Sequence, residues 1–482
     1  MSGNYEVVIG LEVHAQLLTE SKIFCDCSTK FGAAPNTNIC PVCTGQPGVL
    51  PVLNKKVVDF AIKTGLALNA KIAERSVFAR KNYFYPDLPK NYQVSQYDLP
   101  IATKGFLDIV SEGTVKKIGI TRVHLEEDAG KLVHRGAAGL RGSTSSSVDF
   151  NRTGVPLMEI VSEPDIRSPE DAKTYMEELR KILVYLGVCD GNMEEGSLRC
   201  DANISLRPAG QKEFGTKTEV KNMNSFKAVQ KALAAEVKRQ TQVLDEGGRI
   251  VQETRLFDEA SGGTISMRSK EEAHDYRYFP EPDLVPIEID RKWIEDIRKT
   301  ITELPQEKKL RFMKQFGLSD ADAAILTDDK DMADYFEDSV KLLNEPKEIS
   351  NWLIGDASAY CNENKKNVSD LFPPSGLIEI IRQVKKGTIS RKTAKEVFIE
   401  ANNTGKNVND IISESGATQI SGEEELLLVI SEVLAKNPKQ VAEYKAGKVQ
   451  LAAFFVGQVM KATKGRANPE VVNRLLMGGL MQ

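Results

Sequence analysis

The chain lacks several features that would assign it to a membrane or secretory class. No apolar run approaches the roughly 20 residues that cross a bilayer, and the longest are short pieces such as Leu426–Ile430. The first residues contain neither the cationic segment nor the apolar core of a signal peptide. The formal net charge of −4 excludes a globally basic nucleic-acid binder but leaves room for a local basic patch. We therefore expect a cytoplasmic protein without a membrane partner.

Cysteine is sparse, with seven copies in 482 residues, which is not a disulfide framework in a cytoplasmic chain. Four of the seven gather in one polar loop as Cys-x-Cys, twelve residues, and Cys-x-x-Cys. This spacing supplies four thiolates for one tetrahedral zinc ion, and it leaves no open coordination position for catalysis. We expect a structural zinc bound by Cys25, Cys27, Cys40 and Cys43.

What the chain does have is a set of stretches in which apolar and charged residues alternate. Residues 7–15, 120–128, 198–206 and 217–221 follow this pattern. Period two is typical of half-buried β-strands with one wet face. The polar sides of these strands carry Glu12, His14, Arg122, His124, Glu126, Asp128, Arg199, Asp201, Asn203, Ser205, Lys217, Glu219 and Lys221.

For any one strand, a merely solvated face is the simpler explanation, because antiparallel sheets commonly leave one side in water. The composition of the four strands together favours a binding site. Short Asp, Asn and Ser residues stand beside His, Glu, Arg and Lys, where a solvated strand would favour Thr and Lys. Carboxylates suit Mg²⁺, and Arg and Lys suit phosphate oxygens. The pattern therefore predicts a magnesium–nucleotide site.

Three parts of the chain differ in their predicted structure. Residues 1–292 mix strands and helices, with the zinc loop at 25–43 and helix starts at Ser168 and Ser225. Residues 293–405 are almost purely helical, with further helix starts near Pro305, Ser319 and Ser390. A small polar stretch at 402–407 separates a last helical module, 406–482.

The last module has a local excess of positive charge. From Tyr444 onward there are six Lys or Arg residues against one acid, Glu470. Lys461, Lys464 and Arg466 lie around a turn between two helical stretches, where a phosphate backbone could approach. A solvated basic surface explains the same residues equally well.

Six motifs give the chain a resemblance to a known family. Val8–His14, Arg80–Asp87, His124–Lys131, Asp149–Arg152, Ser197–Asn203 and Asp275–Asp283 occur in this order. Together they closely resemble the B-subunit family of the aspartyl/glutamyl-tRNA(Asn/Gln) amidotransferases, over essentially the whole chain. The resemblance implies an α+β fold: a cradle domain with an antiparallel, glutamine-synthetase-like sheet, then an all-α helical domain and a small helical tail domain.

The activity that the resemblance implies is that of a glutamine-hydrolysing carbon–nitrogen ligase acting on misacylated tRNA. ATP phosphorylates the side-chain carboxylate of Glu on tRNA(Gln) or of Asp on tRNA(Asn), and ammonia then displaces the phosphate. Phosphorylation is needed because hydroxide or oxide is a poor leaving group. The tail, with Lys461, Lys464 and Arg466, would contact the tRNA.

The same resemblance assigns roles to individual residues. Glu12, His14 and Glu126 or Glu127 are expected to bind Mg²⁺, although His14 would suit manganese or an outer position better. Asp201, Glu159 and Glu219 are expected at a second metal site or beside the substrate. The phosphate contacts are expected from Lys81, Arg152, Arg199 and Lys221. His134 is expected to be an ordinary surface residue.

The chain lacks an ammonia source of its own. An N-terminal-nucleophile glutaminase needs Cys directly after Met, and this chain has Ser2. The resemblance implies that an amidase A subunit and a small C subunit complete a heterotrimer and deliver ammonia through a tunnel. Two other functions stay open, a free-standing ligase of a small carboxylate and a non-catalytic tRNA-binding scaffold. Whether Gln-tRNA, Asn-tRNA or both are made is also open.

Overall fold

The computed structural model describes residues 4–136, 143–269, 276–414, 423–463, 467 and 469–481. The chain divides into two compact units, Met1–Pro305 and Gln306–Gln482. The first unit contains all the strands that the structure describes, and the second is helical. The predicted α+β class is therefore confirmed. Among the described residues, no helix combines the length and apolar composition that crossing a membrane requires.

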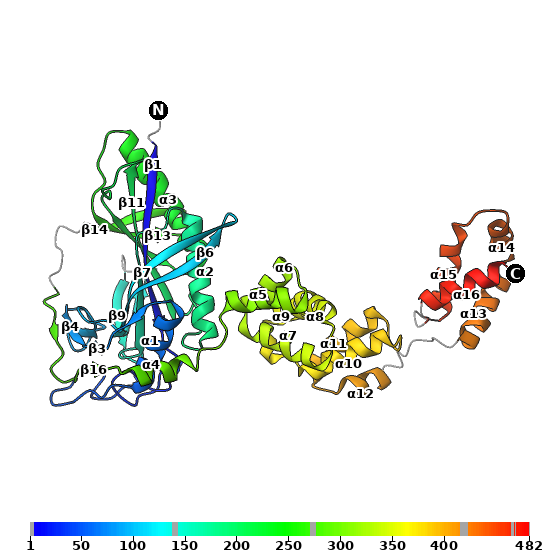
Figure 1. Cartoon of the computed structure of the whole chain (residues 1–482), viewed down its shortest axis with the longest axis horizontal. Coiled ribbons are helices and arrows are strands. Elements are labelled where there is room, and N and C mark those ends of the chain that lie inside the picture. The colour runs from blue at the N-terminus through cyan, green and yellow to red at the C-terminus, as the bar shows by residue number, and fades with distance from the viewer. Residues whose placement is uncertain are drawn as a thin grey trace. The chain divides into compact units, whose positions relative to one another are not determined.

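A nine-stranded sheet organises the first unit (Figure 1). In spatial order its strands are β14 (Gly263–Ser269), β13 (Glu253–Asp258), β12 (Thr218–Met223), β11 (Leu198–Pro208), β1 (Tyr5–Gln16), β10 (Pro156–Ser162), β7 (Thr114–Glu127), β6 (Ala102–Ser111) and β2 (Lys71–Ile72). All neighbours pair antiparallel except β12 and β13, which are parallel. The predicted antiparallel sheet is thus correct apart from this one pair. Its likeness to glutamine synthetase stays a prediction.

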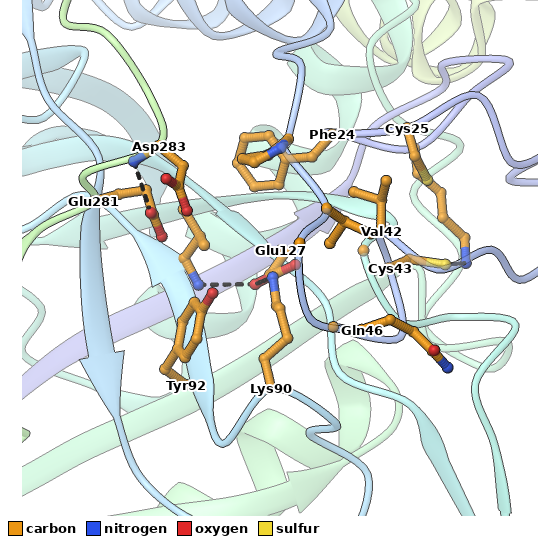
Figure 2. Close-up of a pocket in the computed structure, with 17 residues that line it drawn as sticks. Phe24, Cys25, Val42, Cys43, Gln46, Lys90, Tyr92, Glu127, Glu281 and Asp283 are labelled. Atoms are coloured by element: carbon orange, nitrogen blue, oxygen red, sulfur yellow. Dashed lines mark hydrogen bonds and ion pairs between the residues drawn. The ribbon is translucent and has the colours of Figure 1, made fainter.

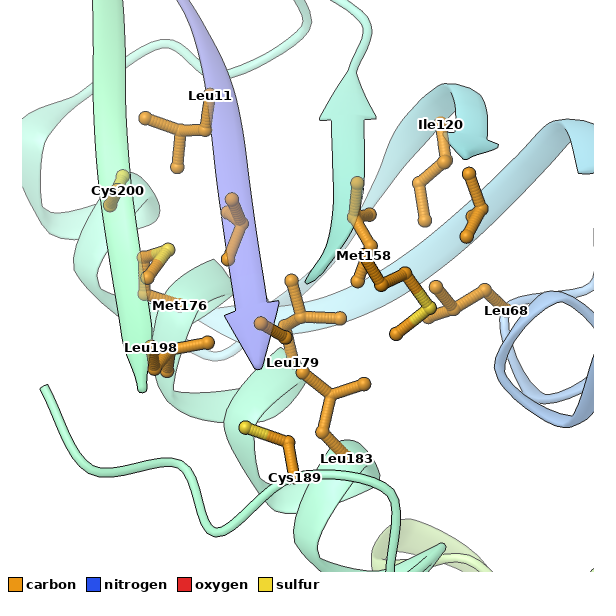
Figure 3. Packing of buried hydrophobic residues seen from close by; sticks show 14 of the residues in the cluster. Leu11, Leu68, Ile120, Met158, Met176, Leu179, Leu183, Cys189, Leu198 and Cys200 are labelled. Atoms are coloured by element: carbon orange, nitrogen blue, oxygen red, sulfur yellow. The ribbon is translucent and has the colours of Figure 1, made fainter. Parts of the chain in front are cut away.

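Helices α1 (Lys55–Ala67), α2 (Pro169–Tyr185) and α3 (Phe226–Asp245) pack against the apolar face of this sheet. Figure 3 shows Leu11 and Leu198 of the sheet facing Met176 and Leu179 of α2. The alternation along β1 explains the arrangement, because its odd residues from 9 to 15 are buried. The even residues Glu12 and His14 therefore emerge on the opposite face.

The caps expected from the sequence are present. Ser168 and Ser225 each accept a hydrogen bond from the backbone N–H three residues later, at the starts of α2 and α3. Ser319 and Ser390 cap their helices in the same way, and a further helix begins at Pro305 as predicted.

Three small sheets and one short helix complete the first unit. They are β15 (Phe279–Pro280) with β4 (Ala79–Asn82) and β5 (Tyr92–Ser95), β16 (Ile287–Glu288) with β3 (Arg75–Ser76), β8 (Lys131–Gly136) with β9 (Ser143–Asp149), and α4 (Arg291–Arg298). The segment with the four clustered cysteines contains no helix or long strand.

The second unit contains two separate hydrophobic clusters. The first is built from α5 (Pro305–Phe316), α6 (Asp320–Asp328), α7 (Lys330–Leu342), α8 (Pro346–Trp352), the π-helical turn η1 (Leu353–Ala357), α9 (Ser358–Asn364), the 3₁₀ turn η2 (Val368–Asp370), α10 (Pro374–Lys385), α11 (Arg391–Thr404) and α12 (Val408–Glu414). The second is built from α13 (Glu423–Lys436), α14 (Pro438–Lys445), α15 (Leu451–Ala462) and α16 (Pro469–Met481). Helix α12 packs into the first cluster, although it lies beyond residue 405. The predicted domain boundaries at 292 and 405 stay predictions.

Candidate active site

The polar face of the sheet brings one row of charged side chains together across four strands. His14 on β1 is directly opposite Arg199 on β11 and Glu159 on β10. Glu159 is in turn opposite His124 on β7. Directly opposed residues in an antiparallel sheet have Cβ atoms about 5 Å apart, so this row forms a continuous site.

Two histidines and two glutamates form the centre of the row. His14 Nε2 lies 3.5 Å from Glu159 Oε2 and 3.7 Å from Glu126 Oε1. His124 Nε2 lies 3.2 Å from Glu159 Oε2 and 3.8 Å from Glu126 Oε2. One ligand atom each from His14, Glu126 and Glu159 lie within 4.8 Å of one another. Two carboxylates and an imidazole are a donor set that fits a divalent cation such as Mn²⁺ or Mg²⁺.

The charges in this cluster are strongly coupled. Burial acts to lower the pKa of His124, but the neighbouring Glu159 and Glu126 carboxylates outweigh it and raise the pKa to about 9. The pKa of His14 is raised in the same way, against burial, chiefly by Glu159. Burial acts to raise the pKa of Glu159, yet the two histidines hold it well below its usual value. A cation that binds to His14 therefore competes with a proton that the two carboxylates favour on its imidazole.

Glu12 lies on the same face but outside the three-residue set. Its Oε1 accepts a hydrogen bond of 2.9 Å from Asn203 Nδ2, and it is directly opposite Asp201. Burial, followed by the Glu159 charge, raises its pKa. A cavity of about 270 Å³ borders Glu12 and is also lined by Asn203, Ser205 and Lys217. The structure thus places Glu12 where the cluster meets an open space.

On the other side of Glu12, the polar face continues to β12. Lys221 forms ion pairs with Asp201 and, at 3.3 Å, with Glu219 Oε1. Glu219 Oε2 accepts a hydrogen bond of 2.8 Å from Thr254. Burial acts to lower the pKa of Lys221, but Asp201 and Glu219 raise it overall. The three residues predicted here are brought together as one ion-pair network.

Two arginines predicted as phosphate contacts share one buried carboxylate, Asp128. Arg199 Nη2 donates to Asp128 Oδ2 at 2.7 Å, and Arg152 Nε lies 3.7 Å from the same oxygen. Gln16 Nε2 donates to it at 2.7 Å. Burial acts to raise the pKa of Asp128, but Arg199 and Arg152 lower it overall. The Nε of Arg199 is buried, and the structure gives it no hydrogen-bond acceptor among the described residues.

Lys81 approaches the cluster from a box of tyrosines. Its Nζ lies 4.8 Å from the ring centre of Tyr276 and 5.8 Å from that of Tyr83. The ring of Tyr278 lies edge-on to Tyr276, with the ring centres 6.0 Å apart. Burial acts to lower the pKa of Lys81, but the charge of Glu126 contributes most to raising it. Lys81 is therefore a cation held next to the candidate metal ligands.

Glu127, the alternative to Glu126, lies on the opposite side of β7 and away from the cluster. Its carboxylate accepts a 2.9 Å hydrogen bond from the Val94 backbone and pairs with Lys90. Figure 2 shows Glu127 and Lys90 at the centre of a cavity of about 200 Å³, between Glu281 on one side and Cys43 on the other. The structure does not bring Glu127 to the metal cluster.

The four clustered cysteines do converge. Ligand sulfurs of Cys25, Cys27, Cys40 and Cys43 lie within 4.8 Å of one another. The Cys25 thiol shares a hydrogen bond with Cys43 and thereby lowers the pKa of Cys43. Four sulfurs with no oxygen or nitrogen among them are the donor set of a closed structural zinc site, so this cluster could bind a structural zinc.

The residues predicted to bind nucleic acid are only partly described. Lys461 is exposed in the last turn of α15. Lys464 and Arg466 lie outside the described residues.

Two residues of the site were not predicted to have an individual role. His124 and Asp128 have the same parity as Glu126 along their strand, which was the signal that could have identified them. The structure adds that both are almost fully buried beside charged partners.

Comparison with known proteins gives consistent matches along the chain. Residues 7–295 match the family model described as the GatB/GatE catalytic domain, and residues 334–480 match the model described as the GatB domain. The candidate site lies wholly within the first match.

Full-length relatives share more than half of their residues with this chain. The B subunit of the aspartyl/glutamyl-tRNA(Asn/Gln) amidotransferase from Thermodesulfovibrio yellowstonii is 59% identical over 473 residues, which cover 98% of each chain. The protein of the same name from Carboxydothermus hydrogenoformans is 58% identical over 98% of each chain. That of Geobacter sulfurreducens is 55% identical over 98% of this chain and 99% of its own.

Proposed function

The chain belongs to the B-subunit family of the aspartyl/glutamyl-tRNA(Asn/Gln) amidotransferases, and from this membership we propose its reaction. It phosphorylates the side-chain carboxylate of Glu or Asp on misacylated tRNA(Gln) or tRNA(Asn) with ATP. It then converts the acyl phosphate to the amide with ammonia, so that the complex is a glutamine-hydrolysing ligase. This tRNA substrate supports a cytoplasmic location for the enzyme.

The observation that carries the proposal is the juxtaposition of a cation site and a set of anion-binding side chains. His14, Glu126 and Glu159 converge on one face of the sheet. Around them stand the four cations Lys81, Arg152, Arg199 and Lys221. A divalent cation needs acidic ligands and a polyphosphate needs basic ones, so a site for both needs this mixture.

We assign the residues of the site as follows. His14, Glu126 and Glu159 would hold the divalent cation, which when bound draws negative charge from the transferring phosphoryl group. Arg199 and Arg152, aligned by Asp128, would contact phosphate oxygens and offset the charge that develops there.

We assign supporting roles to the remaining charged residues of the site. Lys81 would provide a third cation from the tyrosine box. Glu12, Asp201 and Glu219 would orient the substrate or a second cation beside the cavity at Glu12, with Lys221 balancing their charge.

The relatives carry the name of a B subunit, and a subunit implies an assembly. We propose that an amidase A subunit releases ammonia from glutamine and that a small C subunit completes the complex. The basic turn around Lys461 would contact the tRNA, and zinc in the cysteine cluster would be structural.

The test is amidation of misacylated tRNA(Gln) and tRNA(Asn), compared side by side, by the chain reconstituted with its partner subunits. Glu126→Gln keeps the size of the side chain and removes the ligand charge. We expect it to abolish ATP-dependent amidation, whereas Glu112→Gln, at an exposed turn, leaves it unchanged. Full activity of Glu126→Gln would instead support a scaffold. Amide formation on a free carboxylate without tRNA would support a free-standing ligase.

A further inference from the structure

Lys22 is a lysine with no exposed surface, directly beside the cysteine cluster. Its Nζ donates a hydrogen bond of 2.8 Å to the carbonyl of Asn38 and lies 3.5 Å from Cys43 Sγ. Its own backbone N–H donates to the carbonyl of Cys27 at 3.0 Å. Hydrogen bonds therefore connect both the main chain and the ammonium group of Lys22 to the cysteine loop.

Among the described residues, the charge of Lys22 has no carboxylate partner. Within the described residues, no Asp or Glu oxygen lies within 4.0 Å of its Nζ. The nearby Glu127, which lines the same cavity, pairs with Lys90 instead. Burying an ammonium group without an opposite charge is costly, so a neighbouring anion has to compensate it.

The cysteine cluster provides this anion only when its thiols are ionised. Four thiolates around one Zn²⁺ leave the centre with an excess of negative charge. Groups that hydrogen-bond to metal ligands tune such centres, and mutating them typically costs about 10- to 100-fold in metal affinity.

We propose that Lys22 is the charge-compensating residue of the zinc centre, acting on the Cys43 thiolate. This inference rests on the zinc occupancy proposed above. It assigns Lys22 a positioning role for the metal centre and no contact with the reacting substrates.

The experiment measures zinc affinity of the full chain by competition with a chromophoric chelator. Wild type is measured first, and failure to bind zinc would remove the proposed zinc site itself. If wild type binds, Lys22→Met should weaken binding about 10- to 100-fold. Lys30→Met is the matched control, because Lys30 is an exposed lysine of the same loop, and it should leave the affinity unchanged. Equal affinities of Lys22→Met and wild type would overturn the proposal.

A second variant separates charge from packing. Cys27→His replaces one thiolate by a neutral ligand and so reduces the negative charge of the centre. If Lys22 acts through charge, Lys22→Met should cost less affinity in the Cys27→His background than in wild type. An equal cost in both backgrounds would show a packing role and overturn the inference.

Lys22→Gln, which can still donate to the Asn38 carbonyl, should behave as Lys22→Met does. If Lys22→Met is not recovered in folded form, this variant carries the same comparison.

Discussion

The two candidate metal clusters of this chain are built in opposite ways. The His14–Glu126–Glu159 cluster stands on three neighbouring strands of a nine-stranded sheet, and hydrogen bonds between the strands position its ligands. The cysteine cluster stands on a loop with little regular structure. The first is positioned by the strand pairing itself, whereas the second has no such sheet beneath it and would depend on a bound metal for its stability. We therefore expect loss of the first metal to affect chemistry and loss of the second to affect stability.

The largest effect should come from a substitution in the His14–Glu126–Glu159 cluster. His14→Ala removes one ligand from the row and should lower amidation by on the order of 100- to 1,000-fold, since charge stabilisation at the phosphoryl group is lost. The thermal midpoint should change less than the activity does, because the strand ladder stays intact and His124 still pairs with both glutamates. Amidation assays and thermal unfolding of the same preparation measure both quantities. His134→Ala is the matched control, since His134 on β8 contacts Ser146 at the surface and takes no part in the cluster. Wild-type activity of His14→Ala would contradict the assignment.

A substitution in the cysteine cluster should instead lower the thermal stability more than the amidation activity. Replacing Cys40 with Ser removes a thiolate, and we expect the thermal midpoint to fall by about 5 °C or more while part of the activity with free ammonia remains. Cys27→His should retain zinc and most of the stability, since imidazole is also a tetrahedral zinc ligand. Metal analysis combined with calorimetry tests this. Loss of all activity at unchanged stability would reverse the distinction between the two clusters.

The affinity of the His14–Glu126–Glu159 cluster for a cation should depend on pH. The pKa of His124 is raised to about 9, so this imidazole binds a proton at neutral pH, and the pKa of His14 is raised in the same direction. A bound cation has to displace such protons, so Mn²⁺ affinity should rise with pH by up to about tenfold per unit, and level off above pH 9. Titration by electron paramagnetic resonance between pH 6.5 and 9 measures the slope. His124→Gln removes one titrating group and should flatten it. An unchanged slope in this variant would exclude His124 as the competing proton site.

The smallest effect is expected in the tail module. Lys461→Ala should raise the KM for tRNA only about two- to threefold and reduce the slope of log affinity against log salt by about one. Lys436→Ala is the control, because Lys436 is also exposed but lies on α13 and pairs with Glu432. If both variants behave alike, the tail has no specific nucleic-acid surface at Lys461.

The strand faces could be predicted from the sequence because a period of two assigns every residue to one side of the sheet. The helix caps followed from equally local patterns, whereas the α+β class was implied by the resemblance to the family. The order of the strands did not, because β1 lies between β10 and β11, which are far from it in the sequence. For this reason the row from Arg199 through His14 and Glu159 to His124 appears only in three dimensions.

Three cases show the same limit at the level of side chains. The period of two puts Glu126 and Glu127 on opposite faces, but the pairing of Glu127 with Lys90 is visible only in the structure. Glu159 is the one acid within a buried apolar strand, so its partners could not be identified from its neighbours. Lys22 is an ordinary loop lysine in the sequence, and only its complete burial marks it.

The two-sided pairing of β1 also limits how the protein can vary in evolution. Deleting or inserting one residue near Glu12 would turn Glu12 and His14 into the hydrophobic core and expose Val13. A change of two residues would restore the faces but move His14 by about 7 Å along the strand, away from both Glu159 and Arg199. Functional members of this lineage should therefore tolerate substitutions in this strand far better than changes in its length.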